Sequence, residues 1–167
     1  MLQDKKTSVL FVCLGNICRS PTAHGVFEQM VIEQGLNQHI RIDSAGTGDW
    51  HLGKQPDSRT IKAGQQRGYD LRHLRARQVT AVDFDRFDYI LAMDGQNLSN
   101  LQLLQPGHFT GTLSLFLPYG QGAFDEVPDP YSGGAEGFEQ VLDMVEQAAQ
   151  GLLQHLREDV LNDASSS

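Results

Sequence analysis

A short segment at the end of an apolar run constrains this chain more than any other part of it. Residues 9–12 are β-branched, aliphatic or aromatic without alternation, which predicts a strand buried on both faces. Cys13 ends this run, and Ser20 followed by Pro21 is typical of a helix N-cap with proline at the first helical position. The residues between strand and helix are mostly small or polar, and their backbone amides are able to surround an anion.

Cys13 and Arg19 lie near the two ends of residues 13–20, which we call the phosphate loop. We expect a cysteine in such a cradle to be a thiolate, because the amides and the helix N-terminus stabilise its negative charge. The planar guanidinium of arginine binds two phosphate oxygens at once. Attack by Cys13 on a bound phosphate gives a phosphocysteine and divides one difficult step into two. The alternative interpretation of Cys13 is a buried structural cysteine.

Strands and helices alternate along the chain. We expect strands over residues 7–13, 40–44, 87–93 and 112–117, and helices over 20–35, 57–67, 97–104 and 138–160. Such alternation implies right-handed crossovers and an α/β three-layer sandwich, with a four-stranded parallel sheet covered by helices on both faces. We predict the flavodoxin-like strand order 2-1-3-4 in a single domain over residues 1–167, with flexible tails at 1–6 and 162–167.

The loops that follow the predicted strands share one edge of the sheet, where parallel sheets bind their ligands. One of these loops, residues 118–134, is long and rich in glycine and proline. It contains three acidic residues, of which Asp129 lies between two prolines that stiffen the backbone. Asp129 is therefore the best candidate for a general acid that protonates the leaving oxygen. A plain Asp-Pro turn is the alternative interpretation.

Composition limits the partners and cofactors of the chain. Its net charge of −8 makes nucleic acid and anionic membranes unlikely main partners. Two cysteines five residues apart fit neither a disulfide framework nor a zinc site, and the six histidines show no ligand spacing. We therefore expect no metal and no cofactor. The cysteine usage suits a reducing cytoplasm, and no stretch has the length of a membrane span.

Five motifs occur in the order found in the low-molecular-weight protein tyrosine phosphatases, and the chain resembles that family along nearly its whole length. The motifs are VLFVCLGNICRSP at 9–21, DSAGT at 43–47, ARQ at 76–78, YILAMD at 89–94 and DPY at 129–131. The resemblance implies metal-independent hydrolysis of phosphotyrosine in proteins and of small aryl phosphates. It also implies that Cys13 is the nucleophile, Arg19 the transition-state clamp, and Asp129 the general acid and then base.

The resemblance further implies a hydrogen-bond network that holds the phosphate loop. Asn16, Ser20 and Ser44 form this network, with Ser20 donating to the thiolate; helix capping is the alternative role of Ser20. The family has a histidine two residues before Ala-Arg-Gln, whereas this chain has Leu74 there and His73 one residue earlier. Either the local backbone brings His73 into the network or the network lacks this member.

The walls of the substrate pocket are implied by the same resemblance to be Leu14, Ile17, Trp50 and Tyr131. A related branch that prefers phosphoarginine has threonine at the position of Ile17, so isoleucine favours phosphotyrosine. A single tyrosine follows Asp-Pro here, as in many bacterial members, which predicts an open pocket and a bacterial-like member of the family.

Gly15 and Cys18 complete the phosphate loop. Cys18 has two interpretations, a small apolar residue beneath the loop or a resolving thiol that captures oxidised Cys13 as a disulfide.

Two other functions stay open on sequence alone. An arsenate reductase of the same fold relays oxidation through later cysteines, but no cysteine follows Cys18. A non-catalytic phosphate-binding module is disfavoured because Cys13, Arg19 and Asp129 are all present. A P-loop nucleotidase is excluded, since no Gly-Lys-Ser/Thr ends the loop. The expected partners are phosphotyrosine proteins, by analogy a bacterial tyrosine autokinase, and the expected state is a monomer or a weak self-associating species.

Overall fold

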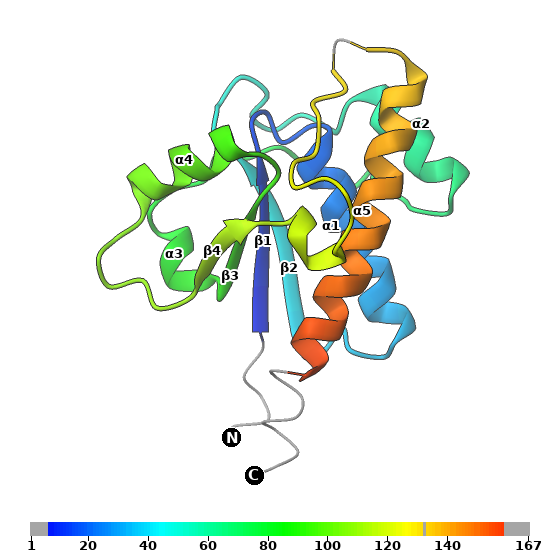
Figure 1. Ribbon diagram of the computed structural model, residues 1–167. Coiled ribbons are helices and arrows are strands. Elements are labelled where there is room, and N and C mark those ends of the chain that lie inside the picture. Colours follow the sequence, from blue (N-terminus) through cyan, green and yellow to red (C-terminus); the bar gives the residue numbers. More distant parts are fainter. Residues whose placement is uncertain (1–6, 132, 159–167) are drawn as a thin grey trace.

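A central parallel sheet organises the computed structural model, which describes residues 7–131 and 133–158 (Figure 1). The tails expected at 1–6 and 162–167 lie outside the described residues, as does the predicted end of the last helix at residue 160. Within the described ranges, no helix is both long and apolar enough to cross a bilayer.

The sheet has four parallel strands in the order β2-β1-β3-β4, which confirms the predicted fold class and strand order. The strands are β1 (Thr7–Cys13), β2 (Ile40–Gly46), β3 (Tyr89–Ala92) and β4 (Thr112–Leu115). Every residue of β1 is buried, as the unbroken apolar run predicts. Cys13 at its end is in register with Gly46 of β2, so the phosphate loop begins at the carboxyl edge of the sheet.

Helices cover both faces of this sheet (Figure 1). They are α1 (Arg19–Glu33), α2 (Ser58–Gln66), α3 (Asp83–Arg86), α4 (Gly95–Leu104) and α5 (Ala135–Leu156), with a 3₁₀ helix η2 (Leu117–Gly120). Alternate β1 residues point to opposite layers. Phe11 packs in a core with α1 and α5, where its ring lies 5.0 Å from that of Phe116, whereas Val12 joins a second core with α3 and α4. The result is the predicted three-layer sandwich.

Local differences from the sequence-based expectation have physical causes. Helix α1 begins at Arg19, and the N-cap position is held by Cys18, whose side chain makes no capping hydrogen bond. The prediction of Ser20 as N-cap is therefore wrong, because its hydroxyl is directed at the phosphate loop instead. Helix α2 is capped by Asp57, the first residue of the range predicted for it, whose carboxylate accepts the backbone N–H of Arg59 at 2.8 Å.

The remaining differences concern element length. Strand β2 runs two residues further than expected, to Gly46, and β3 and β4 are shorter than predicted. Helix α3 was not predicted, since four residues are too few to show an apolar period. Helix α5 begins at Ala135, three residues before the first residue of its expected apolar stripe, and η2 occupies the start of the long loop.

Candidate active site

The phosphate loop curls around the thiol of Cys13. Asn16 adopts a left-handed backbone with φ of 58°, which asparagine tolerates better than most residues. Its N–H points at Cys13 Sγ over 3.3 Å, its side-chain amide donates to Ser20 Oγ at 2.8 Å, and its Oδ1 accepts the N–H of Arg77 at 3.0 Å. Asn16 therefore connects the phosphate loop to the sulfur of Cys13, to Ser20 in helix α1 and to Arg77 in the segment before α3.

The thiol itself is buried and contacted by polar groups. Cys13 is 2% exposed, and its Sγ lies 3.0 Å from Ser20 Oγ. The Ser20 hydroxyl also lies 3.4 Å from the carbonyl of Ala45 in β2. A hydroxyl and a backbone amide directed at sulfur stabilise the thiolate form.

Close packing of backbone against backbone holds the other side of the loop. A Cβ added at Gly46 would lie 2.7 Å from the carbonyl oxygen of Leu14, so only glycine permits this approach. The N–H groups of Thr47 and Gly48 donate to the carbonyls of Cys13 and Leu14 at 2.9 Å each. The end of β2 therefore serves as a template for the first turn of the loop.

Arg19 is a buried cation with fixed orientation. It is 3% exposed, and its Nη1 contacts Asp94 Oδ2 at 2.6 Å and the carbonyl of Val127 at 3.0 Å. Asp94 follows β3 and also caps α4 by accepting the N–H of Asn97 at 2.8 Å. Sequence reasoning did not assign Asp94 to the site. Its position just past a strand, at the edge of the sheet that carries the phosphate loop, was the signal for its contact with Arg19.

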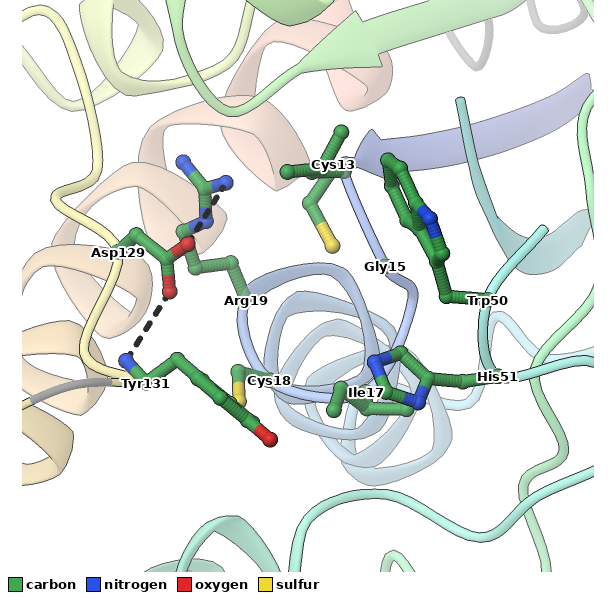
Figure 2. A pocket seen from close by; sticks show the side chains of 10 residues that line it. Cys13, Gly15, Ile17, Cys18, Arg19, Trp50, His51, Asp129 and Tyr131 are labelled. Carbon is green, nitrogen blue, oxygen red and sulfur yellow. Dashed lines mark hydrogen bonds and ion pairs between the residues drawn. The ribbon is translucent and has the colours of Figure 1, made fainter. Parts of the chain in front are cut away.

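Asp129 stands on the opposite side of the pocket from Cys13 (Figure 2). Its side chain is half exposed, and its Oδ2 lies 3.9 Å from Arg19 Nη2. Its Oδ1 accepts the N–H of Tyr131 at 3.0 Å, as expected for an Asp-Pro turn. Asp129 therefore forms this turn and also lines the pocket. Of the other acids in this loop, Glu126 accepts the N–H of Gly95 at 2.7 Å.

These groups converge on one pocket of about 160 Å³ (Figure 2). It is lined by Cys13, Leu14, Gly15, Ile17, Cys18, Arg19, Trp50, His51, Asp129 and Tyr131. Trp50 and Tyr131 are 65% and 51% exposed, as expected for residues at a pocket mouth. His51 was not singled out in the sequence, although it follows Trp50 in the same loop; its ring centroid lies 6.5 Å from that of Tyr131.

Cys18 is a free thiol that is 5% exposed and lines the pocket. Burial raises its pKa to about 12. A thiol of this kind is neutral at physiological pH and a slow nucleophile. This environment favours the small apolar role over the resolving role.

The structure does not bring His73 to the phosphate loop. Its side chain is 60% exposed, and its Nε2 lies 3.8 Å from Glu28 Oε1. Leu74 is buried instead, 8% exposed, whereas His73 lies in the turn at residues 72–73. Of the two alternatives left open by the sequence, the one in which the backbone brings His73 into the network is not observed.

A different histidine reaches Ser44. His24 of α1 is 7% exposed, and its Nδ1 lies 3.1 Å from Ser44 Oγ. Its Nε2 lies 3.7 Å from Glu28 Oε2, and hydrogen bonding with His24 lowers the pKa of that carboxyl. Sequence reasoning missed His24, although it lies four residues after Ser20 and hence on the same helix face.

Comparisons with known proteins identify the family of this chain. The family described as low molecular weight phosphotyrosine protein phosphatase matches residues 8–162. A low molecular weight protein-tyrosine-phosphatase of Streptomyces coelicolor is 44% identical over 156 residues, covering 91% of this chain and 94% of that protein.

Comparison with solved structures also finds protein tyrosine phosphatases with this fold. A protein tyrosine phosphatase from Entamoeba histolytica is 40% identical with a TM-score of 0.87, over 92% of this chain and 98% of that one. Vibrio vulnificus Wzb, solved in complex with benzylphosphonate, is 27% identical with a TM-score of 0.78, over 90% and 99%. The family inferred from the five motifs is confirmed, and this chain belongs to the low molecular weight phosphotyrosine protein phosphatases.

Proposed function

We propose that this protein hydrolyses phosphotyrosine in proteins, and small aryl phosphates, through a phosphocysteine intermediate and without a metal ion. The observation that supports this most directly is the environment of the Cys13 sulfur in the pocket, which lies 3.0 Å from Ser20 Oγ and accepts the N–H of Asn16 at 3.3 Å. Arg19 and Asp129 line the same pocket.

In the first step the loop amides and the Arg19 guanidinium hold the three non-bridging phosphate oxygens. Cys13 attacks phosphorus in line, so that an S–P bond forms and the bond between phosphorus and the aryl oxygen breaks. Asp129, protonated, gives its proton to that oxygen and leaves as a carboxylate.

In the second step the Asp129 carboxylate takes a proton from a water molecule, whose oxygen attacks phosphorus. The S–P bond breaks and inorganic phosphate leaves. Ser20 stabilises the departing thiolate, because its hydroxyl lies 3.0 Å from the sulfur.

Trp50 and Tyr131 at the mouth, with Leu14 and Ile17 below, suit an aromatic ring that carries the phosphate. Wzb, which shares this fold, was solved with benzylphosphonate, an aromatic phosphonate. The proposed substrates are therefore phosphotyrosine proteins, with a bacterial tyrosine autokinase as the candidate by analogy. We propose the reducing cytoplasm as the compartment.

The test is turnover of para-nitrophenyl phosphate and of a phosphotyrosine peptide in the presence of a chelator, with vanadate as inhibitor. Rapid quenching of Asp129→Ala should trap one phosphoryl group on Cys13, seen by mass spectrometry of the peptide. Full activity of Cys13→Ser, or loss of wild-type activity with chelator, would contradict the proposal. Reduction of arsenate by the wild type with an external thiol would instead favour the arsenate reductase alternative.

A further inference from the structure

Arg59 in the first turn of α2 makes a two-pronged ion pair with Asp57. Its Nε donates to Asp57 Oδ1 and its Nη2 to Asp57 Oδ2, both at 3.0 Å. This fork geometry gives direction as well as attraction. Hydrogen bonding with Arg59 lowers the pKa of the Asp57 carboxyl, so the pair is charged at neutral pH.

Asp57 is itself attached to the phosphate loop. Its backbone N–H donates to the carbonyl of Ile17 at 2.8 Å, and its carboxylate caps α2. The position of the Arg59 guanidinium is therefore set relative to the loop that carries the nucleophile.

The same guanidinium also reaches the long loop that carries Asp129, residues 118–134, which we call the acid loop. Nη2 donates to the carbonyl of Tyr131 at 2.8 Å and Nη1 to that of Gly133 at 3.3 Å. The Arg59 Cζ lies 5.4 Å from the centroid of the Tyr131 ring and 4.7 Å from that of Phe138. One side chain thus connects α2, the acid loop and the start of α5.

The backbone of Tyr131 connects Arg59 to the carboxylate of Asp129. The carbonyl of Tyr131 accepts from Arg59, while its N–H donates to Asp129 Oδ1 at 3.0 Å. At the other side of Asp129, the N–H of Val127 donates to the carbonyl of Met93 at 2.7 Å. Asp129 is therefore held between one anchor on the sheet and one on α2.

We propose that Arg59 is a positioning residue for Asp129, joining the phosphate loop to the acid loop so that the carboxyl faces the leaving oxygen. This inference rests on the proposed role of Asp129 as general acid. An exposed ion pair adds little to the free energy of unfolding. The pair of Arg59 and Asp57 therefore acts by positioning Asp129. A displacement of an acid by about 1 Å is enough to cost up to ~100-fold in rate.

The chain contains a matched control. Arg72 pairs with Asp70 at the same spacing of two residues, with Nε to Oδ1 at 3.0 Å and Nη2 to Oδ2 at 3.1 Å. Arg72 follows α2 and lines a separate groove with Ile61 and Gln65. Arg59→Met and Arg72→Met thus remove similar pairs, of which one touches the acid loop.

The experiment measures kcat/KM for aryl phosphates whose leaving groups differ in pKa, from para-nitrophenyl phosphate to phenyl phosphate. We expect Arg59→Met to lower kcat/KM for phenyl phosphate by roughly tenfold more than for para-nitrophenyl phosphate, because only the poorer leaving group needs the proton. Both substrates have one phenyl ring, so a change in the Tyr131 wall affects them equally. Arg72→Met should match the wild type, and Arg59→Lys, which lacks the fork, should behave like Arg59→Met.

Equal losses across the series for Arg59→Met would overturn the inference and leave Arg59 with a wall or folding role only. Asp129→Asn is measured alongside. If Asp129→Asn shows no dependence on the leaving group, the proposed acid is wrong; if it shows one and the Arg59 variants do not, this inference alone is wrong. In an Asp129→Asn background, Arg59→Met should add no further dependence. Thermal unfolding checks the fold, and Arg59→Lys decides the matter if Arg59→Met does not fold.

Discussion

The imidazole Nδ1 of His24 lies 3.1 Å from the hydroxyl of Ser44, so a histidine from α1 contacts the strand that supports the phosphate loop. This contact is present although the segment before Ala-Arg-Gln offers Leu74, which is buried. A histidine therefore contacts the support of the phosphate loop, although it comes from α1 and not from the segment before Ala-Arg-Gln.

His24→Ala should destabilise the protein by about 1–3 kcal/mol, because the buried hydroxyl of Ser44 loses its partner. Urea unfolding measures this change. The control is His73→Ala, whose side chain is 60% exposed and should cost little. The interpretation fails if the two variants have the same free energy of unfolding.

Asp94→Ala should lower kcat/KM by roughly tenfold or more, since the buried guanidinium of Arg19 loses its 2.6 Å partner and its orientation. Asp94→Asn keeps an oxygen for the cap on α4 and separates capping from charge. We expect both variants to lose activity, but only Asp94→Ala to lose the cap, which is worth about 1 kcal/mol of stability. Wild-type kinetics in Asp94→Asn would show that the charge of Asp94 is not needed.

Ser20→Ala should reduce kcat by about 10- to 100-fold, because a hydrogen bond to an anion contributes about 1.5–3 kcal/mol. The loss should fall on breakdown of the phosphoenzyme, so this species should accumulate in a rapid-quench experiment. The melting temperature should change little, since Ser20 is not the cap of α1. A large fall in melting temperature without phosphoenzyme accumulation would point to capping instead.

Cys18 should make stability depend on alkaline pH. Its pKa is raised by burial from 9.0 to about 12, so the folded state retains a proton that the unfolded state loses. This contribution is complete below pH 9 and is lost as the pH rises toward 12. The difference in unfolding free energy between wild type and Cys18→Ser should shift in this window and be flat below it. A flat difference throughout would show that the thiol titrates normally.

The same burial bears on oxidation. After treatment with peroxide and then a reducing thiol, we expect Cys18→Ser to recover activity as fully as the wild type. Much poorer recovery of the variant would establish Cys18 as a resolving thiol despite its burial.

Continuous local patterns made much of the fold predictable. The unbroken run before Cys13 specified a doubly buried strand, and the alternation of elements specified a parallel sheet whose order 2-1-3-4 is observed. Helix α3 has four residues, too few to show the apolar periodicity of a helix. Ser20 kept two interpretations on sequence, because a hydroxyl suits both a helix cap and a thiolate, and only the three-dimensional position of the sulfur distinguishes them.

The site was predictable where the chemistry of a residue agreed with its place after a predicted strand. Cys13, Arg19 and Asp129 were proposed on that ground, Trp50 and Tyr131 were implied by the family resemblance, and all five line one pocket. Contacts between distant segments were not predictable. The contact of Asp94 with Arg19 spans 75 residues and that of Arg59 with Tyr131 spans 72, so neither leaves a local pattern.

The position of Cys13 at the end of the central strand also has a consequence for folding. Its carbonyl accepts Thr47 N–H from just beyond β2 at 2.9 Å, and the carbonyl of Val12 accepts Met93 N–H from the end of β3 at 3.0 Å. Cys13 therefore acquires its surroundings only when both neighbouring strands have docked, and this docking closes long loops of the chain. During refolding, catalytic activity should return no earlier than the slowest of these docking events. The rate at which turnover recovers therefore reports the completion of the sheet.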